Sequence, residues 1–246
     1  MTQKKIALVT GANRGIGLET ASQLGGKGIK VLIGARSEEK GLEAESTLRD
    51  EGLDVEFVKI DVDDPSTHES AQKYIEATYG RLDILVNNAG VFLNEFDNGA
   101  PIPASQTSLE TFRKTFDTNF FNTVAVTQTL LPLVKKSDAG RIVFVSSALG
   151  SLGLHADPDS PIYNFKVPAY NISKTALNGY AIHLAHELRE TPIKVNTIHP
   201  GSVVTDMNAN GEISVEEGAR TSVELATLPA DGYSGKFVHL GEVLPW

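Results

Sequence analysis

Cysteine is absent from this chain of 246 residues. Its absence excludes disulfide bonds, thiolate nucleophiles and cysteine-based metal sites, and it agrees with a reducing compartment. No apolar run approaches the ~20 residues that a membrane-spanning helix needs. The opening Met-Thr-Gln-Lys-Lys leads directly into a strand-like run that starts at Ile6, which leaves no room for the apolar core of a signal peptide. We therefore expect a cytoplasmic protein.

Positive charge is also scarce. Lys and Arg total 22 against 31 for Asp and Glu, so the formal net charge is -9, and no basic cluster is longer than a pair such as Lys135 and Lys136. Binding to a phosphate backbone depends on clustered positive charge, so nucleic acid is not an expected partner. Hydrophobic residues make up 41% and charged residues 22%, as is typical of compact globular chains.

Short apolar runs alternate with longer segments of helical character. The apolar runs predict seven buried strands, at residues 4–10, 30–35, 55–60, 82–86, 141–146, 193–198 and 236–240. The segments between them predict helices at residues 15–24, 38–50, 65–79, 109–135, 169–189 and 215–225. Helical crossovers force neighbouring strands to run parallel and to be buried on both faces. The sequence therefore predicts a doubly wound α/β fold, a Rossmann fold with a seven-stranded parallel sheet, as a single domain over residues 1–246.

A glycine-rich turn follows the first strand. Residues 10–17 read Thr-Gly-Ala-Asn-Arg-Gly-Ile-Gly and open a helix. Glycines let the backbone approach a pyrophosphate closely, and the start of a helix offers free N–H groups and a positive dipole end. A tight turn without a ligand is the alternative. The position at the first strand-to-helix junction favours a dinucleotide, because parallel sheets of this kind bind dinucleotides there.

The second strand ends at Arg36, where NAD-binding sites usually carry an acidic residue that holds the ribose 2'-hydroxyl. A guanidinium can instead pair with a 2'-phosphate through its two-pronged geometry. Arg14 in the glycine turn can add a second positive charge. These two residues predict NADP(H) rather than NAD(H), with solvated surface arginines as the alternative.

Tyr170 and Lys174 lie four residues apart on a predicted helix, so both project from one face. A nearby ammonium favours the phenolate form of a tyrosine and suits it to proton transfer. Ser147, which ends the fifth strand, can donate to a carbonyl oxygen that gains negative charge. Ser146 is its rival. Tyr163 is a rival of Tyr170 but has no lysine four residues further on.

Four motifs together resemble those of the short-chain dehydrogenase/reductase family, in its single-domain subclass. They are residues 10–17, the Asn-Asn-Ala-Gly of residues 87–90, the Tyr-Asn-Ile-Ser-Lys of residues 170–174, and the Pro-Gly turn of residues 200–205. The resemblance covers nearly the whole chain. The glycine turn and an insert before the catalytic helix also resemble the carbonyl-reductase-like branch, which prefers NADPH.

The resemblance implies a role for each matched residue. Tyr170 is the expected proton donor, Ser147 positions the carbonyl, Lys174 binds the nicotinamide ribose and lowers the pKa of Tyr170, and Asn119 anchors a water in a proton relay. No metal is expected. The expected cofactor-binding residues are Gly11, Asn13, Arg14, Gly15, Ile16, Gly17, Arg36, Asp61, Val62, Asn87, Ala89, Gly90, Tyr170, Lys174, Pro200, Gly201, Val203 and Thr205. Asp61 has a plain alternative as a turn residue.

Three segments depart from the family pattern. An insert of about ten residues lies within 149–168 and is expected to cover the substrate pocket, with His155 as a loop residue. Residues 206–214 occupy the place of the family's mobile substrate lid. The C-terminal segment after Phe237 lacks the usual Asp-Gly-Gly. Because the insert adjoins a surface that the family often uses for dimers, both monomer and oligomer stay open.

The sequence thus predicts an NADPH-dependent oxidoreductase that moves hydride between the nicotinamide and a ketone or aldehyde, or the reverse on a secondary alcohol. The partner is a small carbonyl or alcohol compound. An NADP(H)-sensing binding protein without turnover is the alternative. A sugar-nucleotide epimerase or dehydratase fits less well, because those relatives resemble longer chains with another glycine spacing.

Overall fold

A central, mostly parallel sheet organises the computed structural model, which describes residues 4–93, 95–97 and 99–246. Residues 1–3, the start of the opening segment, lie outside this range. The strand order is β10-β9-β8-β7-β4-β1-β2-β3, and β10 runs antiparallel to β9. The strands are β1 (Ile6–Thr10), β2 (Lys30–Ala35), β3 (Val55–Lys59), β4 (Ile84–Asn87), β7 (Arg141–Val145), β8 (Lys194–Ile198), β9 (Phe237–His239) and β10 (Glu242–Val243).

All seven predicted strands are present, and the doubly wound α/β fold is confirmed. The predicted number of strands was one too low, because β10 has only two residues and too few to show an alternating pattern. A separate small hairpin of β5 (Phe96–Asp97) and β6 (Ala100–Pro101) lies between β4 and the next helix.

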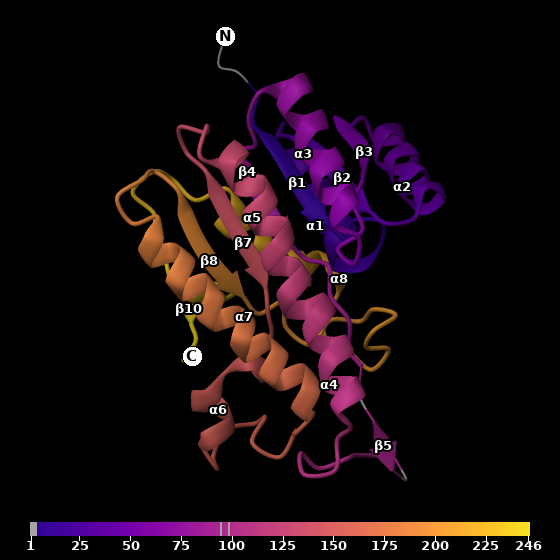
Figure 1. Cartoon of the computed structure of the whole chain (residues 1–246), viewed down its shortest axis with the longest axis vertical. Helices are drawn as coiled ribbons and strands as arrows, with labels where there is room; N and C mark the ends of the chain where they lie inside the picture. The colour runs from indigo at the N-terminus through magenta and orange to yellow at the C-terminus, as the bar shows by residue number, and fades with distance from the viewer. Residues whose placement is uncertain (1–3, 94, 98) are drawn as a thin grey trace.

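Helices cover both faces of the sheet (Figure 1). They are α1 (Gly15–Gly26), α2 (Glu38–Asp50), α3 (Pro65–Tyr79), α4 (Leu109–Phe116), α5 (Asn122–Val134), α6 (Leu152–Ala156), α7 (Pro168–Glu187) and α8 (Val215–Ala226). Local sequence sets several of their ends. The side chain of Asp64 accepts a hydrogen bond from the Ser66 N–H and so caps α3, whose first position is the proline that suits it.

The long helix predicted at residues 109–135 is interrupted. A π-helical turn, η1 (Asp117–Phe121), separates α4 from α5 and contains Asn119. Hydrophobic periodicity does not reveal such a turn. Short π-helical turns often occur at functional sites. The interruption therefore favours a functional role for Asn119.

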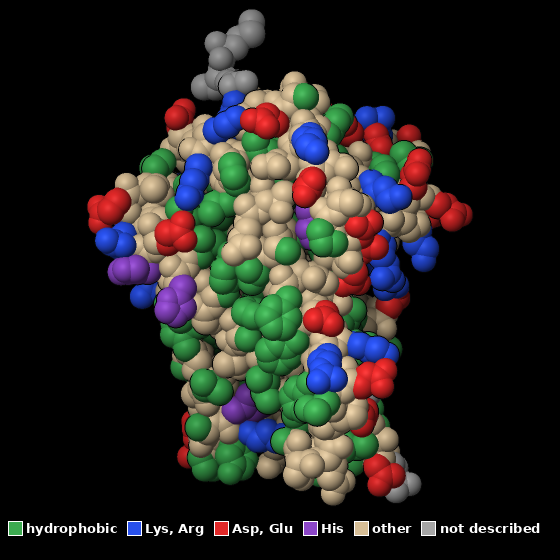
Figure 2. All heavy atoms as spheres, viewed as in Figure 1, with side chains coloured by type: hydrophobic (Ala, Val, Ile, Leu, Met, Phe, Trp, Pro, Cys, Tyr) green, Lys and Arg blue, Asp and Glu red, His purple; other side chains and the backbone are tan. Residues whose placement is uncertain are grey.

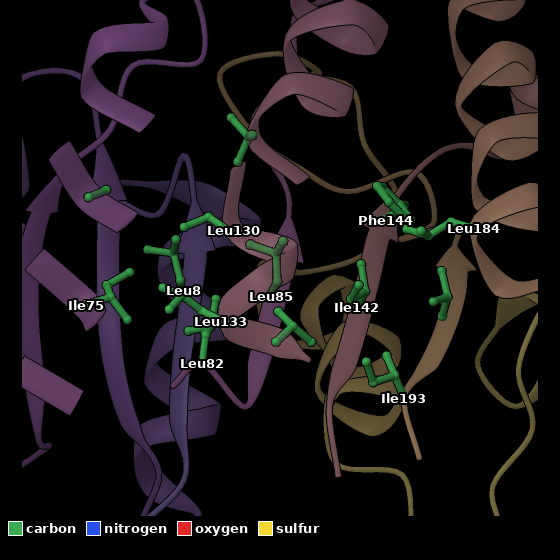
Figure 3. Packing of buried hydrophobic residues seen from close by; sticks show 14 of the residues in the cluster. Leu8, Ile75, Leu82, Leu85, Leu130, Leu133, Ile142, Phe144, Leu184 and Ile193 are labelled. Atoms are coloured by element: carbon green, nitrogen blue, oxygen red, sulfur yellow. The ribbon is translucent and has the colours of Figure 1, made fainter. Parts of the chain in front are cut away.

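Two apolar clusters hold the layers together. The first joins the sheet to α3, α5 and α7, and includes Leu8, Ile75, Leu130, Phe144 and Leu184 (Figure 3). The second joins the opposite face to α1, α2 and α8 through residues such as Val9, Leu24, Leu48 and Val223. Leu8 and Val9 belong to different clusters because successive side chains of a strand point to opposite faces.

The strand order changes direction between β1 and β4. From β1 the chain adds β2 and β3 on one side, then crosses over to β4 on the other side of β1. In sheets of this type, ligands bind outside the carboxyl ends of the strands at such a switch point. Among the described residues, no helix is long and apolar enough to cross a membrane.

Candidate active site

The glycine turn at the end of β1 has a backbone that only glycine suits at several positions. Gly11 and Gly15 have φ values of 65° and 54°, in the left-handed region. A Cβ on Gly17 would lie 2.4 Å from the Gly11 carbonyl oxygen and 2.4 Å from Nδ2 of Asn88. No side chain caps the start of α1 at Arg14. A compact turn at an uncapped helix start fits a pyrophosphate.

Asn88 holds this turn, although the sequence analysis did not select it. Its Nδ2 donates to the Thr10 carbonyl at 2.9 Å, and its backbone N–H donates to Oγ1 of Thr10 at 3.0 Å. The N–H of Ala89 donates to the same hydroxyl at 3.1 Å. Asn88 therefore joins the end of β4 to the start of the glycine turn. Its place in the Asn-Asn-Ala-Gly motif was the available signal.

The residues expected to bind the adenosine end of the cofactor differ in their exposure and in their polar contacts. Arg36 is exposed immediately after β2, and its guanidinium forms no ion pair within the described part of the chain. Arg14 pairs with Oδ2 of Asp206 at 2.6 Å. Oδ1 of Asp61 accepts from the Asp63 N–H at 3.1 Å, as a turn residue does, and Val62 beside it is buried.

Asn87 and Gly90 occupy the two ends of their motif. Nδ2 of Asn87 donates to Oγ1 of Thr127 at 3.0 Å, so this buried side chain joins β4 to α5. A Cβ on Gly90 would lie 3.2 Å from Oδ1 of Asn119 and 3.5 Å from Nζ of Lys174. The structure therefore brings the end of β4 next to the predicted catalytic lysine, where only a small residue fits closely.

The predicted catalytic side chains meet at the carboxyl end of β7. The hydroxyl of Ser147 lies close enough to the phenol of Tyr170 to influence its ionisation, and it accepts from the Leu149 N–H at 3.2 Å. Nζ of Lys174 lies 5.7 Å from the centroid of the Tyr170 ring and donates to the Val145 carbonyl at 2.9 Å. Tyr170 and Lys174 both lie on α7, one turn apart, as their spacing predicts.

Burial controls the ionisation of this pair. Burial raises the pKa of Tyr170 to about 12, although the interaction with Ser147 acts in the opposite direction. Burial also lowers the pKa of Lys174 to about 8. The expected lowering of the Tyr170 pKa is therefore not seen in this structure. That expectation considered the charge of Lys174 but not the removal of both groups from water, which disfavours each charged form.

Asn119 links three parts of the site. Its Oδ1 accepts from the Val91 N–H at 2.8 Å, and its Nδ2 donates to the Val91 carbonyl at 2.9 Å and to Oγ of Ser173 at 3.1 Å. Ser173 immediately precedes Lys174. The buried amide of Asn119 therefore holds the segment after β4, the π-helical turn and α7 in one arrangement.

The structure separates the two pairs of rivals. Ser146 is buried and its hydroxyl is directed at the backbone carbonyl of Lys174, at 3.5 Å, whereas Ser147 reaches the phenol of Tyr170. Tyr163 lies in the insert beneath Nζ of Lys166, which is 4.7 Å from its ring centroid. The geometry therefore favours Ser147 and Tyr170.

Phe92 packs against Tyr170 and was also missed by the sequence analysis. The two ring centroids are 4.7 Å apart and the planes meet at 68°, an edge-to-face contact. Phe92 stands two residues after the Asn-Asn-Ala-Gly motif, but nothing in the sequence pairs it with α7. This ring restricts the orientation of the Tyr170 side chain.

The Pro-Gly turn and the segment after it lie next to the glycine turn. Gly201 has a φ of 95°, and His239 on β9 reaches the carbonyl of His199 with Nδ1 at 2.8 Å, just before Pro200. Val203 is buried and bridges to Ile213. The methyl group of Thr205 would lie 3.6 Å from a Cβ on Gly15. The segment that begins at Pro200 therefore returns to the glycine turn.

The insert folds into a short 3-10 turn, η2 (Ala148–Gly150), followed by α6. Nε2 of His155 lies 3.0 Å from the Leu149 carbonyl, and Lys166 Nζ donates to the His155 carbonyl at 2.9 Å. Nδ2 of Asn171 lies 3.1 Å from the same His155 nitrogen. His155 therefore ties the insert to the start of the catalytic helix.

Comparison with known proteins identifies the family. Residues 5–214 match the family model of short chain dehydrogenases. The chain belongs to the short-chain dehydrogenase family. Short-chain dehydrogenase/reductase 1 of Saponaria officinalis is 34% identical, with 100% of this chain and 97% of the relative covered. Carbonyl reductase [NADPH] 1 of Rattus norvegicus is also 34% identical, with coverages of 100% and 99%.

Solved structures of family members have the same fold. Salutaridine reductase of Papaver somniferum superposes with a TM-score of 0.81 at 32% identity, covering 95% of this chain and 99% of that one. An NADPH-bound carbonyl reductase from chicken fatty liver has a TM-score of 0.83 at 25% identity, with full coverage of both chains. The resemblance to the carbonyl-reductase-like members of the family is thereby confirmed.

Proposed function

We propose that this short-chain dehydrogenase is an NADPH-dependent reductase of ketones or aldehydes, which also catalyses the reverse oxidation of secondary alcohols. One observation carries the proposal. Ser147, Tyr170 and Lys174 converge next to Gly90, beside a glycine turn whose backbone fits a pyrophosphate. Acid–base chemistry and dinucleotide binding are thus combined at one end of the sheet.

Two features support NADP(H) as the cofactor. Arg36 occupies the usual place of an acidic ribose-binding residue, is exposed, and forms no ion pair within the described ranges. An arginine suits a 2'-phosphate through charge-assisted hydrogen bonds. The second feature is the set of relatives, since a rat homologue is named for NADPH and a chicken structure contains it.

The residues that would hold this cofactor surround the switch point between β1 and β4. The glycine turn (Gly11, Asn13, Gly15, Ile16 and Gly17) would face the pyrophosphate, and Arg14 and Arg36 the 2'-phosphate. Asp61, Val62, Asn87, Ala89 and Gly90 would line the adenosine and ribose side. Lys174 and the turn with Pro200, Gly201, Val203 and Thr205 would hold the nicotinamide side. The bound cofactor supplies the hydride that reduces the carbonyl carbon.

Tyr170 then acts as the proton donor. Its raised pKa of about 12 keeps the phenol protonated at neutral pH, so it can transfer its proton to the oxygen that becomes an alkoxide. Ser147 donates a hydrogen bond to the same oxygen and orients the carbonyl. Lys174 places positive charge beside the phenol and favours the phenolate left after transfer.

Asn119 completes the proposed proton path. Its side chain fixes Val91 and Ser173, which are the chain neighbours of Gly90 and Lys174. We assign it the anchoring of a water that returns a proton through Lys174 to Tyr170. Its position in a π-helical turn supports a functional role.

The substrate surroundings favour apolar compounds. Exposed apolar side chains occur on each segment that follows the carboxyl ends of the central strands, namely Phe96, Leu152, Phe165, Val204 and Met207. Figure 2 shows hydrophobic side chains exposed among charged ones on one face of the molecule. Ketones with hydrocarbon substituents are therefore the expected class of substrate.

The decisive experiment measures NADPH and NADH consumption with aliphatic, aromatic and cyclic ketones, comparing wild type with Tyr170→Phe. Removing the proton donor is expected to reduce turnover by about 10²–10⁴-fold, with NADPH affinity unchanged. Tyr163→Phe is the matched control and should retain wild-type turnover. Undiminished turnover in Tyr170→Phe would contradict the mechanism, and equal use of NADH would contradict the role of Arg36. Binding of NADPH without consumption on any ketone would instead support a cofactor-sensing protein.

A further inference from the structure

Two segments that depart from the family pattern, the insert within residues 149–168 and the C-terminal segment after Phe237, contact each other. After β10, the N–H of Leu244 donates to the Phe237 carbonyl at 2.8 Å. The chain then reaches α6, where Oγ of Ser151 donates to the Pro245 carbonyl at 2.8 Å and the Gly153 N–H donates to the Trp246 carbonyl at 2.7 Å. Figure 1 shows the C-terminus beside α6. We refer to residues 244–246 as the tail.

Packing reinforces these hydrogen bonds. The indole of Trp246 stacks on the buried ring of Phe237, with centroids 5.6 Å apart and planes 21° from parallel. A Cβ on Gly153 would lie 3.2 Å from Cβ of Pro245 and 3.2 Å from the Trp246 carbonyl oxygen. The tail therefore lies so close to α6 that a side chain at position 153 would push the two apart.

The contact continues toward the catalytic serine. Ser151 is fully buried, and its Oγ both donates to the tail and accepts from the Leu154 N–H at 3.0 Å, which caps α6. The Ser151 N–H donates to the Ala148 carbonyl at 2.9 Å, and the Gly150 N–H donates to the Ser147 carbonyl at 2.8 Å. Successive short turns thus connect Ser147 to the residue that the tail holds.

Helix α6 is too short to be stable without contacts to other parts of the chain. It has five residues, whereas isolated helices shorter than about 12–15 residues are marginal in water. Its far end is tied to the catalytic helix through His155 and Asn171. Its near end, beside Ser147, is held through Ser151 and Gly153 by the tail.

Gly150 of η2 is held directly by α7. Its carbonyl accepts from Oγ1 of Thr175 at 2.9 Å and from Nδ2 of Asn178 at 3.3 Å. The tail therefore fixes the start of α6 after η2, at Ser151 and Gly153.

We propose that the tail is a brace that fixes α6 in the segment after Ser147, and that Trp246 and Gly153 are positioning residues that determine which carbonyl substituents the site accepts. The inference rests on the proposed reductase function. A carbonyl held by Ser147 and Tyr170 must direct one substituent toward the segment that follows Ser147. A fixed wall there admits some large substituents and excludes others, while small ketones do not reach it.

The chain supplies its own probe of the brace, since Trp246 is its single tryptophan. Tryptophan emission, excited at a wavelength that tyrosine does not absorb, therefore reports only on the tail. We would compare Gly153→Ala, which adds a methyl group against the tail, with Gly179→Ala on α7, where an added Cβ meets nothing within 4 Å. In Gly153→Ala, emission should shift to longer wavelength and acrylamide quenching should increase. Gly179→Ala should match wild type in both.

Kinetics test the consequence for specificity. For the largest and the smallest ketone that wild type reduces, the ratio of kcat/KM should change by about fivefold or more in Gly153→Ala. The change should lie mainly in KM for the large ketone, while NADPH affinity stays within about twofold. Trp246→Ala serves as a second variant with the same expected ratio, in case Gly153→Ala folds poorly.

Three outcomes would contradict the inference or the function on which it rests. If the emission of Gly153→Ala matches wild type, the tail is not seated against Gly153 and the inference is overturned. If the emission changes but neither variant alters the ratio of kcat/KM, the tail has no influence on specificity and the inference is again overturned. If wild type reduces no carbonyl compound, the proposed function itself fails, which is a distinct result.

Discussion

The proposed cofactor side and the proposed substrate side of the site are held in different ways. On the cofactor side, the backbone leaves no room for a side chain, since a Cβ on Gly17 would lie 2.4 Å from the Gly11 carbonyl oxygen, and Asn88 joins two adjacent strand ends. On the substrate side, longer segments are held by a few hydrogen bonds between distant residues, such as Ser151 and Pro245, 94 residues apart. Both sides thus depend on bonds between distant residues, such as Asn88 to Thr10, 78 apart, but only the cofactor side also has backbone that leaves no room for a Cβ.

This difference predicts that the two sides tolerate substitutions unequally. A change in the glycine turn meets backbone that cannot move, so few residues are tolerated there. A change in the insert or the tail meets side chains and short turns that can rearrange. The two sides should therefore respond to comparable substitutions with effects of different size.

The largest effect is expected at Gly17. Gly17→Ala places a Cβ against the Gly11 carbonyl and Asn88, so we expect the free energy of unfolding to fall by about 1–3 kcal/mol and NADPH binding to weaken by tenfold or more. Gly26→Ala in the same helix is the control, because a Cβ there meets nothing within 4 Å. Chemical denaturation and NADPH titration measure both. Equal behaviour of the two variants would mean that the cofactor side is no more tightly built than the substrate side.

An intermediate effect is expected from pH. Burial lowers the pKa of Lys174 from its ordinary value to about 8, so the ammonium form predominates below that pH and is progressively lost above it. If carbonyl reduction needs the charged lysine, kcat/KM for NADPH should fall about tenfold per pH unit above 8. Tyr170, with a pKa of about 12, stays protonated over this range.

Lys174→Arg provides the comparison for this profile. A guanidinium keeps its charge throughout, so the fall above pH 8 should disappear even if overall activity is lower. Circular dichroism at pH 9.5 would verify that wild type remains folded. A wild-type profile that stays level up to pH 9.5 would rule out Lys174 as the group that titrates.

The smallest effect on NADPH binding is expected at the ion pair that joins the glycine turn to the segment after the Pro-Gly turn. Asp206, after the Pro-Gly turn, pairs with Arg14 of the glycine turn, and both side chains are exposed. Removing this competitor for Arg14 in Asp206→Asn should tighten NADPH binding by about two- to fivefold at low salt. The gain should shrink at high salt, because exposed charges are screened.

Glu212→Gln is the matched control for this pair. Glu212 lies in the same segment, is exposed, and its side chain forms no ion pair among the residues that the structure describes. It should leave NADPH affinity unchanged. An equal gain in both variants would show a general charge effect rather than release of Arg14.

Much of the site could be predicted because its signals are local. Three glycines within seven residues, and a tyrosine and lysine one helical turn apart, keep their relation whatever the rest of the chain does. The choice of Ser147 over Ser146 needed the resemblance to the family. The structure places the two hydroxyls on different partners, at Tyr170 and at the backbone of Lys174.

Other features could not be predicted, since each depends on residues far apart in the chain. The π-helical turn at Asn119 accompanies bonds to Val91 and Ser173. The ring of Phe92 meets Tyr170 only after β4 and α7 have packed together. The contact between the tail and α6 has no pattern of its own in either segment.

By itself, the sequence determined the alternation of strands and helices, the glycine turn and the Tyr170–Lys174 spacing, because hydrophobic period and backbone sterics act over a few residues. Tertiary structure decided the ionisation of that pair. Burial raises the pKa of Tyr170 and lowers that of Lys174, because both charged forms lose solvation. Tertiary structure also decided what lies beside Ser147, because only the folded sheet brings the tail to the insert.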